Sequence, residues 1–99
     1  MVEMKRMELS ESKHVLGMQI YLPHLNLYLI VTPNAILCDE SFQLAYLETR
    51  YPDCMILQVP KARQLEDLLE GELVGFSHAA GKYGVTCQMK GKDGLEKLP

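Results

Sequence analysis

The stretch from residue 27 to residue 59 constrains the fold of this chain more than any other. Its first apolar run, Leu27–Val31, is followed by Thr-Pro-Asn at 32–34 and by a second run, Ala35–Cys38. Proline presets φ at the first corner of a turn and asparagine tolerates a left-handed conformation at the next, so the two runs are predicted to pair as a hairpin. The unbroken apolar character of the first run predicts a central strand that is covered on both faces.

A helix and a further strand are predicted after the hairpin. Residues 40–51 carry apolar side chains at helical spacing, with Asp39 or Ser41 as the N-cap. The next short run, Cys54–Val59, is rich in residues that favour strands. A strand-helix-strand unit of this length favours a right-handed crossover, which makes its two strands parallel. The hairpin and the crossover together predict a mixed β-sheet.

The segments on either side complete the predicted fold. Residues 2–9 and 14–22 read as strands separated by a polar turn, with Val15, Ile20 and Leu22 directed inward. Further strands are predicted at 73–76 and 85–89 and short helices at 63–70, 78–83 and 92–98, with helix caps at Gly71, Ser77 and Gly84.

The chain length fits one domain. A chain of 99 residues can bury roughly two-thirds of its unfolded surface, which is enough to fold without covalent cross-links. We therefore expect a single compact α+β (α/β-like) domain over residues 1–99. Its N-terminal antiparallel meander is followed by βαβα units, with short helices packed on the mixed sheet.

The composition limits the classes of partner. A net charge of -3 with scattered Lys and Arg argues against nucleic-acid binding, which normally needs a clustered basic face. The apolar segment at 15–31 is interrupted by Pro23, His24 and Asn26, so strands rather than a membrane span are expected. A hydrophobic fraction of 47% is high for so short a chain, and burial in a homo-oligomer is a common use for such a surplus.

The cysteines and histidines indicate a compartment and argue against metal binding. Cys38, Cys54 and Cys87 are odd in number and widely spaced, which favours reduced thiols. The N-terminus lacks the features of a signal peptide, so a cytoplasmic protein is expected. The three histidines are far apart in sequence, and no metal or other cofactor is predicted.

Cys38 is the first candidate for chemistry. It is predicted at the end of a strand and directly before a helix, where ligands bind to open sheets and where the helix dipole lowers a thiol pKa. Asp39 shares this joint as a candidate ligand-binding residue, although its carboxylate disfavours a thiolate. A covalent mechanism also needs a base, for which His78 is the candidate. The alternative is that Cys38 is a small buried apolar residue, as free cysteine usually is.

Lys61, Arg63 and Gly91 are candidates for binding an anion. The two cations precede or open the predicted helix at 63–70, where an anion among them would offset their unfavourable position near the helix dipole. Gly91, between Lys90 and Lys92, is a weaker candidate because it lacks the spacing of a phosphate loop. The alternative is that both segments are solvated charged turns.

From Leu22 onward, a series of short motifs occurs in a characteristic order. They are Leu22-Pro23, Ile36-Leu-Cys38 before a helix, the helix Arg63–Leu69, the Ala79-Ala80 helix that ends at Gly84, Met89-Lys-Gly91, and Leu95–Leu98. In this order they resemble the YunC-like family of small proteins, a domain of unknown function. The resemblance implies a compact α/β domain with a mixed sheet and implies no established reaction.

Three positions depart from the family pattern. Asp39 stands where the family has glycine, Gln88 also replaces a glycine, and Lys90 replaces a small hydroxyl residue. If those family residues shape a ligand site, the site is altered here. We expect a binding or oligomerising module, with a small anionic ligand as one occupant. The alternative is a thiol-dependent enzyme or redox-responsive protein that uses Cys38.

Overall fold

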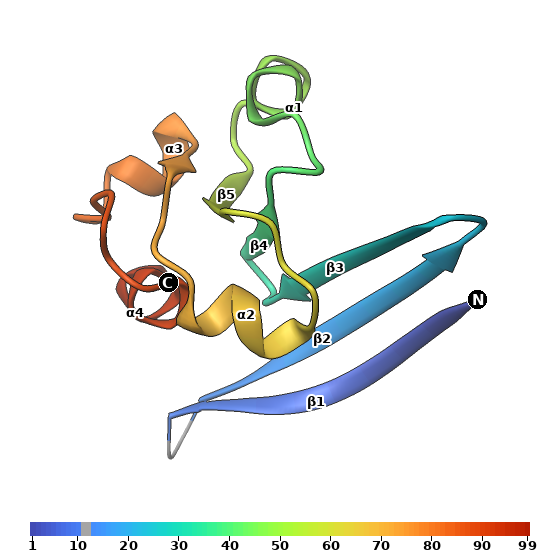
Figure 1. The fold of residues 1–99 in the computed structure, drawn as a ribbon. Coiled ribbons are helices and arrows are strands. Elements are labelled where there is room, and N and C mark those ends of the chain that lie inside the picture. Colours follow the sequence, from blue (N-terminus) through green and yellow to red (C-terminus); the bar gives the residue numbers. More distant parts are fainter. Residues whose placement is uncertain (11–12) are drawn as a thin grey trace.

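The computed structural model describes residues 1–10 and 13–99 and contains a six-stranded sheet in the order β1-β2-β3-β4-β5-β6 (Figure 1). The strands are β1 (Val2–Ser10), β2 (Lys13–Leu22), β3 (Leu25–Val31), β4 (Ala35–Asp39), β5 (Met55–Val59) and β6 (Gly75–Phe76). The helices are α1 (Leu44–Arg50), α2 (Leu65–Glu70), α3 (His78–Gly81) and α4 (Gly91–Lys97). The turn predicted between the first two strands includes residues 11 and 12, which lie outside the described residues.

The mixed sheet predicted from the sequence is confirmed. β1, β2, β3 and β4 pair antiparallel in succession, β5 lies parallel to β4, and β6 lies antiparallel to β5. The hairpin predicted at 32–34 is confirmed, because the Thr32 N–H donates to the Ala35 carbonyl at 2.9 Å and the Ala35 N–H donates to the Thr32 hydroxyl at 2.9 Å. Asn34 does not adopt the left-handed conformation on which that prediction relied. The helix of the parallel crossover is α1.

The main core lies between one face of the sheet and the helices α2 and α4. Leu37 and Leu57 of the parallel strands are fully buried there, together with Leu65, Leu68 and Leu95 of the helices. α1 lies on the opposite side of β4 and β5 from α2 and α4 (Figure 1). The side chain of Gln58, which points to that opposite face, donates to the Phe42 carbonyl just before α1. The parallel strands therefore form the middle of three layers.

α1 is shorter than predicted. It begins at Leu44 after the extended residue Gln43, which makes no side-chain cap, and it contains no buried residue. The prediction of Asp39 or Ser41 as N-cap was wrong. Asp39 is the last residue of β4, and its carboxylate accepts hydrogen bonds from two backbone N–H groups outside any helix. That bonding holds the chain in a loop where the apolar spacing indicated helix.

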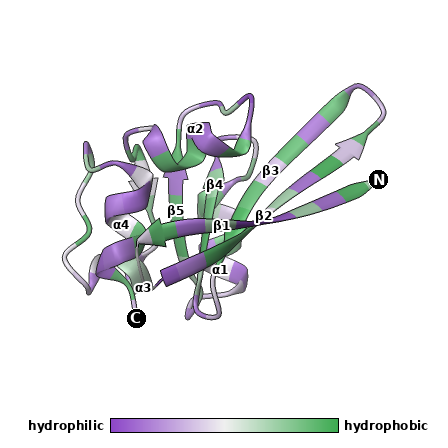
Figure 2. Cartoon of the chain, turned by 90° about the horizontal axis from the view of Figure 1, so that it is seen from below, coloured by the Kyte–Doolittle hydropathy of each residue, from purple (hydrophilic) through white to green (hydrophobic). Residues whose placement is uncertain are grey.

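β1, β2 and β3 form a long meander with two different faces, and the hydropathy alternates along these strands (Figure 2). Val15 is buried as predicted, but Ile20 and Leu22 lie on the opposite face, and Leu22 is 45% exposed. β3 is not covered on both faces, because Tyr28 and Ile30 are buried whereas Leu27, Leu29 and Val31 are only half-buried. The apolar run of β3 contributes to a surface as well as to the core.

The C-terminal half differs most from its prediction. Residues 85–89 do not form a strand, and Gln88 has φ of 78°. Leu73 instead pairs with this segment through two backbone hydrogen bonds, N–H to the Met89 carbonyl at 2.7 Å and carbonyl to the Gln88 N–H at 3.1 Å. Gly84 has φ of 85° and is left-handed as expected, but it does not end the helix, because α3 stops at Gly81 with Lys82 as its C-cap. Gly71 does not adopt the predicted left-handed conformation, since its φ is -69°.

In the described part of the chain, every helix is too short or too polar to cross a membrane.

Candidate functional site

A hollow of about 420 Å³ lies beyond the carboxyl ends of β4 and β5. Its lining comes from the turn between β2 and β3, the end of β4 and the loop after β5: His24, Leu25, Asn26, Tyr28, Asp39, Ser41, Lys61, Ala62 and Arg63. Three residues that the sequence marked as ligand-binding candidates, Asp39, Lys61 and Arg63, are therefore brought together. Its volume is within the usual range for a small-molecule site.

The topology explains why a hollow forms at this place. The chain leaves β4 toward α1 on one face of the sheet and leaves β5 toward α2 on the other face (Figure 1). Where neighbouring parallel strands send their connections to opposite faces, a crevice opens beyond the strand ends, and open α/β sheets bind ligands there. Among the described strands β4 and β5 are the parallel pair, and the hollow lies where their connections leave to opposite faces of the sheet.

Asp39 holds the two loops around the hollow in place. It is only 3% exposed, and its carboxylate accepts from the Ser41 N–H at 2.9 Å and from the Ala62 N–H at 3.0 Å. Because both oxygens accept from the protein, Asp39 joins the β4 loop to the β5 loop and acts as a positioning residue.

Lys61 and Arg63 supply positive charge at the rim. Both residues are exposed, and among residues 1–10 and 13–99 neither side chain forms an ion pair. The nearby Asp67 is engaged elsewhere, since its carboxylate accepts from the backbone N–H of Arg63 at 3.0 Å. The guanidinium and the ammonium thus remain available as donors, and Arg is well suited to paired contacts with carboxylate or phosphate oxygens.

His24 and Tyr28 were not singled out as ligand-binding residues from the sequence. His24 occupies the tight turn between β2 and β3 with φ of 61°, and Tyr28 is a buried residue of β3. Each lies far in sequence from Lys61, and the fold alone brings them to one hollow. The Pro23-His24 turn was visible in the sequence, but the strand pairing that aims it at the β5 loop was not.

Cys38 is placed differently from the prediction. It is an internal residue of β4, with Leu29 and Gln58 as its neighbours across the sheet, and α1 begins only at Leu44. The thiol is 1% exposed and its sulfur lies 3.7 Å from the Leu57 carbonyl. Burial, with a smaller contribution from the negative charge of Asp39, raises the pKa of Cys38 to about 12. The thiol behaves as a buried apolar group, and no helix dipole activates it.

His78 does not accompany Cys38. It is the first residue of α3, its backbone N–H donates to the Glu48 carboxylate, and it lines a different hollow together with Lys82. The two residues proposed as nucleophile and base are therefore located at separate sites, one buried in the sheet and one on the surface.

Gly91 is part of the packing between helices. A Cβ atom at this position would lie 2.0 Å from the Leu68 carbonyl oxygen, and the Gly91 N–H donates to the Gly71 carbonyl at 2.8 Å. Lys90 and Lys92 both form ion pairs of 3.1 Å with Glu70, whose pKa they lower. The anion site predicted at Gly91 is not supported, because its donors already have partners.

Within the described ranges, no group of three His, Cys, Asp or Glu residues is placed to hold a metal ion. The fold and the hollow define a class of protein: a small α+β domain with an antiparallel meander, one parallel crossover and a crevice at the parallel strand ends. No family model matches the chain, and no curated protein matches it.

A solved protein with this fold is TA1206 from Thermoplasma acidophilum, whose function is unknown. The two structures superpose with a TM-score of 0.85 over 100% of this chain and 94% of that one, at 17% sequence identity. At this identity the similarity shows a shared fold. The resemblance to the YunC-like family stays a prediction.

Proposed function

We propose that this protein binds a small anionic ligand in the hollow beyond β4 and β5. The observation that carries the proposal is the convergence of Lys61, Arg63 and His24 on one hollow whose buried acid, Asp39, has both oxygens occupied. Lys61 and Arg63 form no ion pair among the described residues and therefore favour an anion, and the two hydrogen bonds that Asp39 already accepts reduce its opposition to one.

The chemistry of the lining favours a carboxylate or phosphate compound of modest size. A hollow of about 420 Å³ admits a compound of a few tens of atoms at most. The hydroxyls of Tyr28 and Ser41 can donate to further oxygens, and Leu25 offers an apolar wall. Binding rather than turnover is proposed because the candidate nucleophile Cys38 and the candidate base His78 do not line this hollow.

A titration followed by NMR tests the proposal. Inorganic phosphate and succinate are added separately to ¹⁵N-labelled protein, and chemical shifts are expected to change at residues 61–63 and 24–26. Arg63→Ala and Lys61→Ala should each weaken binding roughly tenfold, since a charge-assisted hydrogen bond contributes about 1.5–3 kcal/mol before solvent screening at an exposed position.

Lys82→Ala is the matched control, because it removes one exposed cation from the separate hollow beside His78. Its affinity for the anion should equal that of the unmodified protein. If the chemical shifts do not change with about 10 mM of either anion, the proposal is contradicted. It is also contradicted if all three substitutions weaken anion binding equally, because that result indicates general charge attraction.

Two further predictions from the sequence remain proposals. We propose a cytoplasmic location, supported by three free thiols of which Cys87 is exposed, a state that a reducing compartment preserves. Membership of the YunC-like family is proposed from the order of the motifs in the sequence and from a fold of the expected type.

A further inference from the structure

We propose that one face of the N-terminal meander is the contact surface of a homodimer formed by two copies of this chain. The face, called here the outer face, is the side of β1, β2 and β3 that points away from α2. Its apolar members are Val2, Met4, Leu16, Met18, Ile20, Leu22, Leu25, Leu27, Leu29 and Val31.

The strand register places these side chains on one surface. Met4 pairs with Met18, which in turn pairs with Leu29, and Leu22 pairs with Leu25. Directly paired residues in adjacent strands project to the same side of a sheet, so each row continues across all three strands. Figure 2 shows the resulting alternation of hydrophobic and hydrophilic residues along the meander.

The inner and outer faces of the meander differ in how their polarity relates to the elements that cover them. The inner face is apolar only where α2 covers it, and beyond that helix it carries Gln19, Tyr21 and Asn26. Apart from the end that carries Arg6, Glu8 and His14, the outer face stays apolar although no element of the described chain covers it there, and Met4 is 66% exposed. A sheet face that faces water is normally polar, so this surface has the composition of one that is covered.

The area suits a dimer. Five of the outer-face residues, Val2, Met4, Leu16, Leu22 and Leu25, are each 37–66% exposed. Their exposed parts together make an apolar patch on the order of several hundred Å², a size that marks interaction sites on monomers and a large share of the roughly 800 Å² per partner of a standard interface. Sheets pack face to face at about 10 Å with their strands about 30° apart, and a second copy offers a surface with the same twist. A two-fold axis makes a single apolar face complementary to itself.

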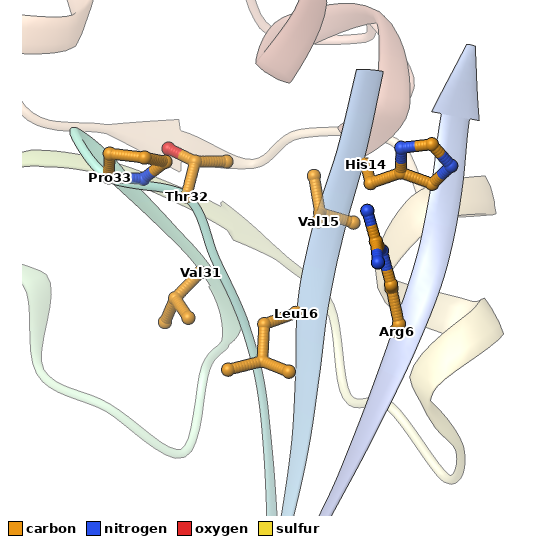
Figure 3. Close-up of a pocket in the computed structure, with 7 residues that line it drawn as sticks. All are labelled: Arg6, His14, Val15, Leu16, Val31, Thr32 and Pro33. Atoms are coloured by element: carbon orange, nitrogen blue, oxygen red, sulfur yellow. The ribbon is translucent and has the colours of Figure 1, made fainter. Parts of the chain in front are cut away.

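The polar residues of the outer face gather at one end. Arg6, Glu8 and His14 lie there, and a hollow of about 510 Å³ opens beside them, with Leu16 and Val31 directed into it (Figure 3). An apolar centre with charges at the rim is the usual anatomy of a protein interface. A net charge of -3 disfavours an anionic lipid surface as the occupant.

Analytical ultracentrifugation of the full chain tests the proposal. At about 50 µM the unmodified protein is expected to sediment as a dimer. The double variant Met4→Lys and Leu22→Lys should raise the dissociation constant of the dimer by at least about 100-fold, because each introduced charge is buried twice in a two-fold interface. Neither residue lines the anion hollow, so the chemical-shift changes that phosphate causes at residues 61–63 should be retained in this variant.

Val74→Lys is the matched control, since Val74 is an exposed apolar residue outside the meander, with an exposed fraction of 48%. It should dimerise as the unmodified protein does. Circular dichroism and thermal unfolding verify that the double variant is folded. A folded unmodified protein that is monomeric at about 50 µM would overturn the proposal. If that monomer also co-floats with phosphatidylcholine vesicles, a lipid surface rather than a second copy covers the outer face, and the proposal is overturned as well. A dimer that persists in the double variant would overturn it as well, because its contact would lie elsewhere.

Discussion

Cys38 illustrates how the same residue changes meaning when its surroundings are known. In the sequence it is the thiol that precedes an acidic residue and an amphipathic segment, a pattern typical of a strand-to-helix joint. In the structure it is a β4 residue that is 1% exposed, and the nearest helix begins several residues later. Burial disfavours the thiolate, so the pKa of Cys38 rises where a helix N-terminus would have lowered it.

The raised pKa predicts a loss of stability in alkali. In the unfolded chain the Cys38 thiol has the ordinary cysteine pKa of 9.0, whereas in the folded protein its pKa is about 12. Above the lower value the unfolded state binds fewer protons than the folded state, so stability is fully present below pH 9 and falls as the pH rises toward 12. Between about pH 8 and about pH 10 this group should contribute a loss of about 1.4 kcal/mol.

Urea unfolding at both pH values measures this change. Cys38→Ala is the reference, because it retains the other alkaline titrations of the chain, including those of the tyrosines and lysines. The difference in free energy of unfolding between the two pH values should be smaller in the variant than in the unmodified protein. Equal differences would mean that the Cys38 thiol ionises normally in the folded state.

At the scale of elements, α3 depends on one buried hydroxyl. Ser77 is 0% exposed; its hydroxyl donates to the Cys54 carbonyl at 2.9 Å and accepts from the N–H groups of Ile56 at 3.0 Å and Ala80 at 3.3 Å. Ser77 therefore caps α3 and joins it to the start of β5. The sequence predicted the cap, and the fold added the bonds to the strand.

Ser77→Ala should lower the free energy of unfolding by about 2 kcal/mol. The substitution removes a helix cap and leaves buried backbone groups of β5 without a partner. Chemical denaturation is the measurement, and Ser10→Ala on the exposed end of β1 is the control, expected to change stability by less than about 0.5 kcal/mol. If both variants are equally stable, the hydroxyl does not join the two elements.

The contact between α2 and α4 depends on glycine. A Cβ at Gly91 would lie 2.0 Å from the Leu68 carbonyl oxygen, which belongs to the rigid backbone of α2. A Cβ at Gly94 would meet only the ends of the Leu73 and Leu57 side chains, at 2.9 and 3.0 Å. Side-chain ends can rotate away, whereas a helix backbone moves only as a unit.

Gly91→Ala is accordingly expected to destabilise the protein by about 3 kcal/mol or more, and Gly94→Ala by less. In a solvent-exposed helix a Gly→Ala substitution normally stabilises the protein by roughly 0.5–1 kcal/mol. A loss of stability on Gly91→Ala would therefore indicate a steric clash. Thermal unfolding of the two variants measures which substitution destabilises more, with Glu96→Ala at an exposed position of the same helix as the control. A Gly91→Ala variant at least as stable as the Gly94→Ala variant would contradict the close approach of α4 to α2.

At the scale of the whole molecule, the sheet divides into two parts with different surroundings. β4 and β5 have helices on both faces, and their carboxyl ends form the proposed anion site. β1, β2 and β3 have α2 on one face and present the proposed dimer surface on the other. The two proposed sites meet at Leu25, which lines the hollow and also belongs to the outer face. Lys61 and Arg63 belong to the hollow alone, and Met4 and Leu22 belong to the outer face alone, so these four residues allow each site to be tested separately.

The sequence by itself determined the local elements whose signals are contained in a short stretch. The hairpin closed at 32–34, the cap at Ser77 and the left-handed Gly84 are confirmed, because each depends on residues adjacent in the chain, although Asn34 itself is not left-handed. The crossover between β4 and β5 also followed from the order of its elements and the handedness rule.

Only the tertiary structure decided which faces are buried and which distant residues meet. The apolar run of β3 does not reveal that one of its faces lacks a covering helix, and the alternating residues at 85–89 do not reveal that Leu73 binds their backbone. His24, Asp39 and Arg63 line one hollow because three strands in register bring their ends together. Local preferences act over a few residues, whereas burial and site geometry are set by contacts between segments far apart in the chain.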